Sequence, residues 1–336
     1  MKTALVTGAS GVIGPPLIHH LMERGYRVRA FLRPSLSPRP LPKSVETVQG
    51  EITDYHALGR AVHNVDTIFH LAAQLHIDRP SPALQGECVR INVEGTRRLV
   101  EVAQAAGIGR FIFFSTINVY GSSQPNQLLT EDSPLHPDSL YAETKIQGER
   151  FALAHLPAVI LRLAAVYGPG MKGNYVSLMN ALRRRQFIMI GDGRNRRTLI
   201  HSKDVCKAAV LAAEKACALG QIFNVTDGHV HTLQDIIKAM CTGLGQRVPR
   251  FHLPVNLARF TADLLEAGMK VIGRNPPIRR AMVDKITQDI AVSGDKIQHQ
   301  LGYKAEHSLT RGWCETIDIE RRLVTRHLGS LVASVG

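Results

Sequence analysis

The sequence predicts an α/β fold in which a parallel sheet is wound with helices on both faces. Apolar runs of four to six residues alternate with segments whose apolar residues recur at helical spacing. This alternation is typical of βαβ units, which bury both faces of a parallel sheet. The predicted strands are Ala4–Thr7, Arg27–Leu32, Glu46–Gln49, Thr67–Leu71, Arg110–Ser115, Ala158–Leu163 and Ile222–Val225.

The loop after the first strand carries three glycines at a spacing suited to a dinucleotide. Gly8 would turn the chain, Gly11 would let a pyrophosphate approach the backbone, and Gly14 would let the next helix pack closely. Amide groups at the start of that helix would face the phosphates. A purely structural turn is the alternative, but strand, glycines and helix follow one another here in the expected order. The sequence therefore predicts a Rossmann-type domain.

In the first half of the chain the predicted helices connect strands, and after Gly168 they are no longer followed by sheet strands in alternation. Connecting helices are expected at Pro15–Arg24, Ala57–Val62, Asn92–Ala106 and Ser139–Ala154, with Gly107 ending the third. After Gly168 the chain has loops rich in Gly, Pro and Asn, and separate helices at Leu233–Leu244 and Leu257–Ile272. We expect a dinucleotide-binding domain over residues 1–168, to which the strand near 222–225 returns. A smaller C-terminal substrate lobe would take most of residues 169–330.

Cysteine usage and hydropathy indicate the compartment. The five cysteines are scattered with no C-x-x-C pair, and no charged-then-apolar leader precedes the first strand. We therefore expect a reducing cytoplasm and no metal site. The stretch Leu257–Ile272 contains Arg259, Asp263, Glu266 and Lys270, so it cannot be a simple membrane span. It is predicted to be an amphipathic helix that packs on the protein rather than on lipid.

The formal net charge of +13 would suit nucleic acid, anionic lipid or a polyanionic small molecule. Arginines cluster at 183–185, at Arg194, Arg196 and Arg197, and at Arg279 and Arg280. These clusters have no interleaved aromatic residues and no nucleic-acid motif, so nucleic acid is not expected. They form either a solvated basic face or a site where at least one arginine holds a substrate diphosphate.

Tyr141 and Lys145 lie four residues apart, on one face of a helix that begins near Ser139. The preceding strand ends in Ser115 and Thr116, at the edge where such sheets bind ligands. We expect the Lys145 ammonium, with a positively charged nicotinamide, to lower the pKa of Tyr141 from about 10 toward neutral pH. Tyr141 would then exchange a proton with a carbinol or carbonyl oxygen while the nicotinamide exchanges hydride. A buried tyrosine followed by a solvated lysine is the structural alternative.

These motifs resemble the extended short-chain dehydrogenase/reductase family, the NAD-dependent epimerase/dehydratase family. The glycine triplet after Thr7, HLAA at 70–73, INVEGT at 91–96, VYG at 119–121 and VYGPG at 166–170 all match. The resemblance implies Thr116, Tyr141 and Lys145 as the catalytic set. Ser115 is the less favoured neighbour of Thr116, because adjacent strand residues point to opposite faces. The implied cofactor contacts are Gly8, Ser10, Gly11, Val12, Ile13, Gly14, Arg33, Ile52, Asp54, Leu71, Ala72, Ala73, Tyr141 and Lys145. For His70 and Asn92 a structural role is at least as well supported as ligand contact.

The preferred cofactor depends on the end of the second strand. NAD-binding members carry an acid there for the ribose hydroxyls, whereas this chain has Leu32 followed by Arg33. An arginine suits a 2′-phosphate through its planar fork. We therefore expect NADP(H) to be favoured over NAD(H), although members with this arginine can also use NAD.

The second lobe resembles the nucleotide-sugar branch of the family, over Gly168–Asn174, Gly191–Val205 and Asp289–Tyr303. In that branch the arginine at the Arg197 position contacts the diphosphate, and the aspartate at the Asp204 position opens a helix. A nucleoside-diphosphate sugar is therefore the expected substrate. The predicted substrate contacts are Asn174, Arg197 and Arg280.

The reaction type stays open in part. Dehydratases of this branch carry an Asp-Glu pair after the catalytic threonine, where this chain has Ile117 and Asn118, so dehydration is not expected. A 4-keto reductase or a 4-epimerase remains, with reduction preferred, and Ala165 stands where sugar epimerases commonly carry asparagine. The other hypotheses are a dehydrogenase of a sterol-like or other apolar alcohol, and a non-catalytic NADP-sensing binding module. The resemblance also implies a homodimer, built on the Tyr141 helix and the Asn92–Ala106 helix.

Overall fold

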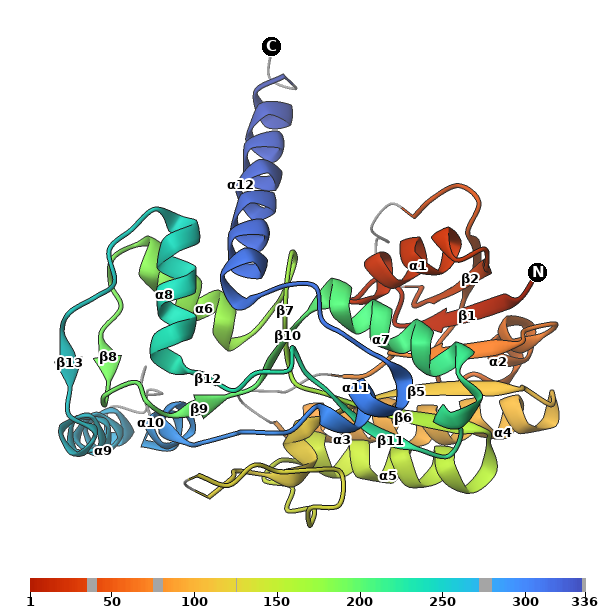
Figure 1. The fold of residues 1–336 in the computed structure, drawn as a ribbon, viewed down its shortest axis with the longest axis horizontal. Coiled ribbons are helices and arrows are strands. Elements are labelled where there is room, and N and C mark those ends of the chain that lie inside the picture. The colour runs from red at the N-terminus through yellow and green to blue at the C-terminus, as the bar shows by residue number, and fades with distance from the viewer. Residues whose placement is uncertain (35–40, 75–80, 125, 272–279, 334–336) are drawn as a thin grey trace.

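The computed structural model describes residues 1–34, 41–74, 81–124, 126–271 and 280–333. Its centre is a seven-stranded sheet of order β11-β6-β5-β4-β1-β2-β3, in which every neighbouring pair is parallel (Figure 1). The strands are β1 (Thr3–Thr7), β2 (Arg27–Leu32), β3 (Glu46–Gln49), β4 (Thr67–His70), β5 (Arg110–Thr116), β6 (Ala158–Leu163) and β11 (Ile222–Val225). The predicted strands are confirmed to within one residue at each end, and so is the doubly wound, Rossmann-type fold.

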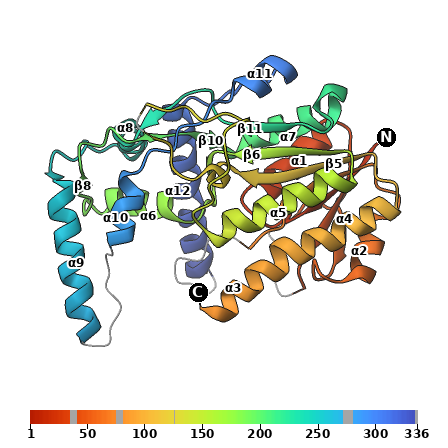
Figure 2. The same ribbon diagram turned by 90° about the horizontal axis from the view of Figure 1, so that it is seen from below.

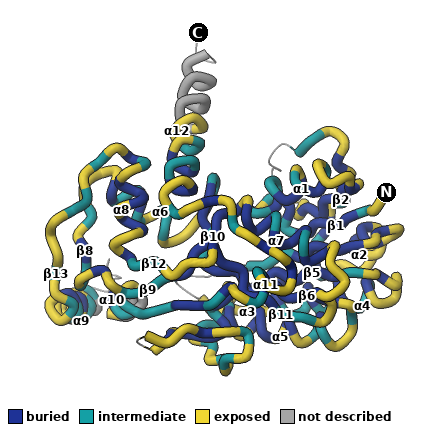
Figure 3. Tube along the Cα trace, viewed as in Figure 1, coloured by how far each residue is buried: buried dark blue, intermediate teal, exposed yellow. Residues whose placement is uncertain are grey.

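Helices cover both faces of this sheet (Figure 2). On one face lie α1 (Gly14–Glu23) and α7 (Ser202–Glu214), and on the other α2 (Tyr55–Val62), α4 (Thr96–Ala105) and α5 (Leu140–His155). Strand residues alternate between the two cores, because Ala4 and Val6 pack into one and Leu5 into the other. Burial on both sides is why the inner strands β1, β4, β5 and β6 appear in the sequence as largely apolar runs, whereas the edge strand β3 is mostly exposed (Figure 3).

The third predicted helix begins ten residues earlier than the expected start at Asn92. It opens as α3 (Pro82–Val89), passes through a π-helical segment η1 (Arg90–Gly95) and continues as α4. Ser81 caps it by accepting a hydrogen bond from the amide of Leu84, and a proline follows directly, which is a common helix start. Cys88 is the only buried residue of α3, so no apolar periodicity marks this part in the sequence.

The second lobe is built from helices and three short strand pairs. The pairs are β7 (Ala165–Tyr167) with β10 (Leu199–His201), β9 (Arg196–Arg197) with β12 (His231–Thr232), and β8 (Met189–Ile190) with β13 (His252–Leu253). The helices are α6 (Asn174–Arg183), α8 (Leu233–Leu244), α9 (Val255–Val271), α10 (Arg280–Thr287) and α12 (Leu309–Ala333), which projects from the body (Figure 1). The lobe's core centres on Trp313, whose ring stacks on Tyr167 at 4.6 Å between centroids. Two 3₁₀ turns, η2 (Ile117–Tyr120) and η3 (Ala216–Ala218), and helix α11 (Asp295–Leu301) complete the fold.

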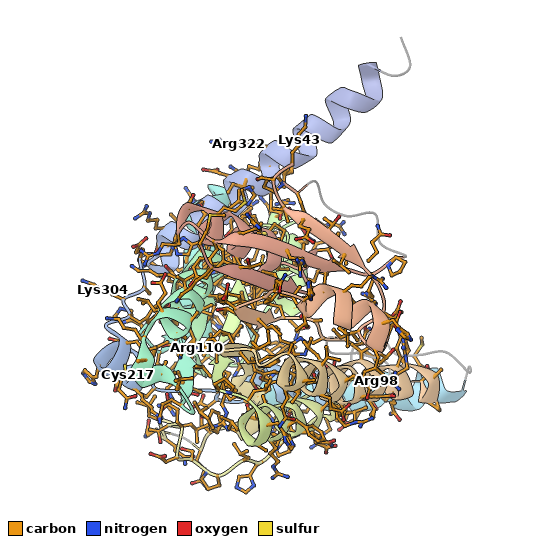
Figure 4. All side chains as sticks on the ribbon, turned by 90° about the vertical axis from the view of Figure 1, so that its right-hand side faces the viewer. Lys43, Arg98, Arg110, Cys217, Lys304 and Arg322 are labelled. Carbon is orange, nitrogen blue, oxygen red and sulfur yellow. The ribbon has the colours of Figure 1, made fainter. Side chains whose placement is uncertain are left out.

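The thiols and the helix lengths bear on the protein's environment. All five cysteines lie in the described part of the chain and are free thiols. Cys217 is exposed close to Lys215, whose carbonyl oxygen accepts a hydrogen bond from Arg110 (Figure 4). Among the described helices, none is both long and apolar enough to cross a membrane.

Candidate active site

The glycine loop between β1 and α1 leaves a bare backbone at the carboxyl end of the sheet. Gly8 has φ +70°, and a Cβ there would lie 2.7 Å from the amide nitrogen of Ala72. A Cβ on Gly14 would lie 2.3 Å from the carbonyl oxygen of Ala9, so chain packing requires both glycines. Gly11 is exposed, and a Cβ there would approach only the Gly8 carbonyl oxygen, at 3.2 Å. Gly11 is therefore the position that keeps space open for a phosphate beside the backbone.

The start of α1 offers fewer amide donors than we expect from the sequence. Pro15 and Pro16 occupy its first turn and have no N–H, so the helix itself cannot present those donors to a phosphate. The amides of Val12, Ile13 and Gly14, which precede the prolines, remain as candidate donors. The half-buried side chains of Ser10, Val12 and Ile13 surround this loop.

The end of β4 is fixed against the glycine loop by buried hydrogen bonds. The Thr7 hydroxyl contacts Nδ1 of His70 at 2.7 Å and accepts a hydrogen bond from the amide of Ala72 at 3.3 Å. On the other side of the ring, Nε2 of His70 contacts the Thr96 hydroxyl at 2.9 Å. Burial, and next the charge of Lys145, lower the pKa of His70 to about 3, so the ring is neutral. Leu71, Ala72 and Ala73 follow, half-buried, beside Gly8.

Asn92 joins the chain beyond β4 to the catalytic helix. Its Oδ1 accepts the amide of Gln74 at 2.7 Å, and its Nδ2 donates to the Gln74 carbonyl oxygen at 3.1 Å and to the Thr144 hydroxyl at 3.0 Å. The π-helical segment η1 carries this side chain. The hydrogen bonds of both His70 and Asn92 are therefore structural.

Tyr141 and Lys145 lie one turn apart near the start of α5, whose N-cap is Ser139. Thr116 ends β5 and is buried, with Oγ1 accepting the amide of Asn118 at 3.2 Å. Lys145 is buried, with Nζ 4.3 Å from the centre of the Phe113 ring. Strand β5 and helix α5 thus bring Thr116, Tyr141 and Lys145 to the same edge of the sheet as the glycine loop.

The electrostatics of the pair differ from the expectation that Lys145 lowers the pKa of Tyr141. Burial, and next the nearby thiol of Cys88, raise the pKa of Tyr141 above its ordinary value. Burial lowers the pKa of Lys145 to about 8, and Glu149 partly offsets this. In the protein alone, burial sets the direction of both pKa shifts, and the phenol is therefore protonated at neutral pH. The expected lowering of the Tyr141 pKa in the presence of a positively charged nicotinamide stays a prediction.

A buried ionic network lies beneath this site and was not predicted. Glu149 of α5 accepts the Ser115 hydroxyl and pairs with Arg162 of β6, at 2.7 Å between Oε2 and Nη2. Arg162 also donates to the Tyr120 hydroxyl at 2.8 Å, which in turn donates to Asn224 at 2.8 Å. Burial alone would lower the pKa of Arg162, but Glu149 raises it above its ordinary value. The charged residue within the apolar run AVILRL was the signal in the sequence.

The adenosine end of the predicted cofactor site lies along β2 and α2. Arg33 follows β2 and is exposed. Asp54 caps α2, with Oδ1 accepting the amides of His56 at 2.9 Å and Ala57 at 3.3 Å. Ile52 is buried and packs against Gly95. A Cβ added at Gly95 would lie 2.6 Å from Cγ2 of Ile52. These positions fit an adenosine end, with Arg33 as the exposed cation at the end of β2.

The predicted substrate residues are spread over the second lobe. Arg197 is half-buried in β9 and donates to the carbonyl oxygens of Gln288 and of Ile286, the latter at 3.0 Å. Burial lowers its pKa, with Tyr175 partly offsetting the effect. Asn174 is exposed at the start of α6. Arg280 pairs with Asp263 at 2.6 Å in the α9–α10 hairpin, far from α5 in Figure 1. Arg279 and Ile272 lie outside the described residues.

His201, Asp204 and His307 form a buried cluster that sequence analysis did not identify as a group. Each offers one ligand atom, and these atoms lie within 4.8 Å of one another. Asp204 accepts hydrogen bonds from the backbone amides of Glu306 and His307. Its carboxylate also contacts Nδ1 of His307 at 3.0 Å, and this contact raises the pKa of His307. Nε2 of His307 lies 3.3 Å from Glu315 of α12. The cluster therefore attaches residues 306–307 and α12 to the start of α7, where Asp204 lies in the first turn.

A parallel sheet of this order, with a glycine loop after β1 and a tyrosine–lysine pair on α5, is the arrangement of a dinucleotide-dependent enzyme. The chain belongs to the NAD dependent epimerase/dehydratase family, which matches residues 4–226. It is accordingly an NAD(P)-dependent enzyme of the extended short-chain dehydrogenase type.

Named relatives cover nearly the whole chain. A 4-hydroxy-2-methyl-3-oxo-4-farnesyl-3,4-dihydroquinoline-1-oxide ketoreductase of Stigmatella aurantiaca is 28% identical, over 90% of this chain and 92% of its own. The N-acetyl-alpha-D-glucosaminyl-diphospho-ditrans,octacis-undecaprenol 4-epimerase of Escherichia coli O157:H7 is 24% identical over 94% of both chains. The solved structure of MoeE5 with UDP-glucose and NAD superposes with a TM-score of 0.75 at 28% identity, over 96% of this chain and 100% of that one.

Proposed function

We propose that this protein transfers hydride between a nicotinamide cofactor and carbon 4 of a nucleoside-diphosphate sugar, as a 4-keto reductase in preference to a 4-epimerase. The observation that carries the proposal is the placement of Arg197. Its neighbour Thr198 accepts the amide of Ala165 at 3.2 Å, directly after the carboxyl end of β6. The Arg197 segment therefore lies along the edge of the sheet where ligands bind in this fold.

Different residues of the chain contact the substrate oxygen and the cofactor. When bound, the nicotinamide supplies or accepts hydride. Tyr141 exchanges a proton with the substrate oxygen, and Thr116 donates a hydrogen bond to that same oxygen. Lys145 presents its ammonium beside both and stabilises negative charge on the phenol oxygen once the proton has left. The bare backbone at Gly11 receives the pyrophosphate.

The protonation state of Tyr141 supports the reductive direction. A phenol whose pKa is raised holds its proton at neutral pH and can donate it to a carbonyl oxygen as that oxygen becomes an alkoxide. Oxidation of an alcohol would first require removal of this proton. A protonated phenol is the state that reduction of a ketone uses, which agrees with our preference for the 4-keto reductase.

A diphosphate would compensate the buried charge of Arg197. Burial lowers the pKa of the Arg197 guanidinium, and an anion placed against it would favour the charged form. MoeE5 binds UDP-glucose, and the Escherichia coli relative acts on a diphosphate-linked sugar at position 4. We propose the same class of group here, with Asn174 and Arg280 as further contacts.

Replacing Arg197 by alanine tests the substrate class. The KM for a nucleotide sugar should rise about tenfold or more, while cofactor affinity changes little. Exposed Arg194 serves as the matched control, and Arg194→Ala should leave the KM near that of the wild type. UDP should also raise the melting temperature of the wild type. If millimolar nucleoside diphosphates leave the melting temperature unchanged and Arg197→Ala is kinetically silent, the nucleotide-sugar proposal fails.

We further propose NADP(H) as the favoured cofactor, a homodimer formed through α4 and α5, and a cytoplasmic location. Exposed Arg33 at the end of β2 supports the first. The side-by-side position of α4 and α5 on one face of the sheet supports the second (Figure 2). The five free thiols fit a reducing compartment and support the third.

A dehydrogenase or reductase of an apolar substrate is the second candidate. The Stigmatella aurantiaca relative is a ketoreductase of a farnesyl-bearing quinoline and is 28% identical to this chain. We propose that Tyr141 and Lys145 would serve reduction of such an apolar ketone equally well, with no diphosphate against Arg197. A non-catalytic NADP-sensing module is disfavoured because Tyr141 and Lys145 are both present in a built site.

A further inference from the structure

Large apolar side chains are exposed along the outer end of the second lobe. We call this surface the apolar rim. It consists of Ile188, Phe251, Leu257, Phe260, Leu264 and Leu265, which are 39% to 82% exposed. Apart from Met1, the four most exposed large hydrophobic side chains of the described chain all belong to it. Such concentration on one surface distinguishes a contact site from the scattered apolar residues of any protein surface.

Helix α9 provides most of the rim. Ala258 and Ala262 are buried and hold the helix against the lobe, together with Val283 of α10. Leu257, Phe260 and Leu264 follow at spacings of three and four residues, so they form one stripe on the solvent side. The sequence predicts that α9 packs on the protein through its apolar face. The structure instead packs the alanines inward and leaves the larger side chains outside.

The β8–β13 pair extends the rim beyond α9. Met189 pairs with His252, so Ile188 and Phe251 are neighbours at the start of this pair. Strand β13 leads directly into α9, and Figures 1 and 2 both place α9 at the end of the molecule farthest from α2 and α4. The rim is therefore a continuous outer edge, remote from Tyr141.

Unneutralised arginines border the rim. Arg250 directly precedes Phe251. Arg247 lies near Arg183–Arg185, because the side chain of its neighbour Gln246 donates a hydrogen bond to the carbonyl oxygen of Arg183 at 3.2 Å. Within the described ranges, none of these five guanidiniums makes an ion pair. Two acids of α9 and α10 are already paired, Asp263 with Arg280 at 2.6 Å and Asp284 with Arg259 at 2.7 Å, and the third, Glu266, accepts the backbone amide of Arg280 at 2.7 Å. The border therefore presents net positive charge.

The sequence concentrates its charge in the same two segments. Residues 183–197 hold six arginines and one aspartate, and residues 246–287 hold eight arginines and lysines against three acids. These segments carry most of the chain's formal net charge of +13. In the described structure, the part of this charge that borders the rim is that of Arg183–Arg185, Arg247 and Arg250.

We infer that the apolar rim and its arginine border dock this protein on the surface of an anionic lipid bilayer. An amphipathic helix with an apolar stripe and flanking cations lies in the plane of a membrane interface, with its apolar side chains among the acyl chains and its cations at anionic headgroups. A second copy of the chain fits less well, because a two-fold contact would bring the same arginine borders together. Nucleic acid fits less well because four of the six rim side chains, Ile188, Leu257, Leu264 and Leu265, are aliphatic and offer no ring on which bases stack. The inference goes beyond the proposed function and does not depend on it.

Sedimentation with vesicles tests the docking surface without any turnover. We expect at least tenfold more wild-type protein bound to vesicles of phosphatidylcholine with phosphatidylglycerol than to phosphatidylcholine alone, and a marked loss at 0.5 M salt. Phe260→Gln with Leu264→Gln should lower binding to the anionic vesicles at least tenfold. The matched control, Leu128→Gln with Leu219→Gln, removes two exposed leucines elsewhere and should stay within twofold of the wild type.

A charge-reversal pair tests the border and covers the case in which the rim variant does not fold. Arg247→Glu with Arg250→Glu should lower binding at least tenfold, whereas Arg60→Glu with Arg150→Glu, the same change in net charge on another face, should stay within threefold. Melting temperatures close to the wild type establish that the variants are folded. The inference is overturned if the wild type does not prefer anionic vesicles, or if controls and test variants lose binding equally. It is also overturned if the rim variant changes the molecular mass in ultracentrifugation, or if single-stranded DNA binds more tightly than the vesicles.

Discussion

Replacing Glu149 by glutamine should destabilise the protein strongly, although the change removes a single charge. The Glu149 carboxylate is 4% exposed and receives Arg162 through Nε at 3.1 Å and Nη2 at 2.7 Å, as well as the Ser115 hydroxyl. Glutamine keeps the shape but not the charge. The Arg162 guanidinium, also 4% exposed, would then remain buried with the Tyr120 hydroxyl and a neutral amide as its partners.

The expected loss is about 3–5 kcal/mol of unfolding free energy, which is the usual cost of leaving one member of a buried ion pair without its counterion. At a urea slope of about 3 kcal/mol per molar, the unfolding midpoint should fall by about 1–1.7 M. The ion pair holds α5 against β6, so the loss should reach the catalytic helix as well. Glu149 also raises the pKa of Lys145, and Glu149→Gln should therefore shift that pKa further below about 8.

Urea unfolding followed by circular dichroism measures the loss, and a double-mutant cycle assigns it. Glu149→Leu with Arg162→Met should lose less than Glu149→Leu alone, because replacing both charges removes the uncompensated one. Glu143→Gln, at an exposed position on the same helix, is the control and should change the midpoint little. A loss below about 1 kcal/mol for Glu149→Gln, or strict additivity in the cycle, would refute the reasoning.

Three further outcomes are expected. Tyr141→Phe should lower kcat by about 10²–10⁴-fold with cofactor affinity and melting temperature unchanged, and turnover within threefold of wild type would remove Tyr141 from the mechanism. Arg33→Ala should cost about 1.5–3 kcal/mol of NADPH affinity in titration calorimetry and little NADH affinity, whereas equal losses would make Arg33 an ordinary surface residue. His70 is buried with a pKa of about 3, so the unfolded chain takes up its proton first as pH falls below about 6.5. Its contribution to stability should fall by about 2 kcal/mol from pH 7.5 to 5, and His70→Gln should lack that part of the pH dependence in urea midpoints.

The sheet could be predicted in detail because its signal is local. A strand buried on both faces needs apolar residues throughout, and Gly, Pro and polar residues bound each run, so both type and length are written in the sequence. The same holds for the start of α5, where Ser139 caps the helix that carries Tyr141 and Lys145. The early start of α3 was missed because only Cys88 of that helix is buried, although Ser81 and Pro82 form a recognisable start.

The electrostatics could not be predicted because they depend on distant residues. Glu149 and Arg162 lie 13 positions apart and meet only through the packing of α5 on the sheet. The pKa of Tyr141 was expected to fall, but the balance between burial and the Lys145 charge is set by tertiary structure. The outward face of α9 was missed for a related reason. Periodicity shows that a helix has two faces but not which one meets the protein, and here the small Ala258 and Ala262 face inward.

Isotope transfer tests the proposed function most directly. The purified protein would be incubated with nicotinamide cofactor deuterated at the hydride-donating carbon and with a nucleoside-diphosphate 4-keto sugar, and the product examined by NMR and mass spectrometry. We expect one deuterium at carbon 4 of the sugar, and about 10²–10⁴-fold slower formation of this product by Tyr141→Phe. Deuterium in an apolar ketone supplied in parallel, with none in any nucleotide sugar, would contradict the account and favour the apolar-substrate enzyme.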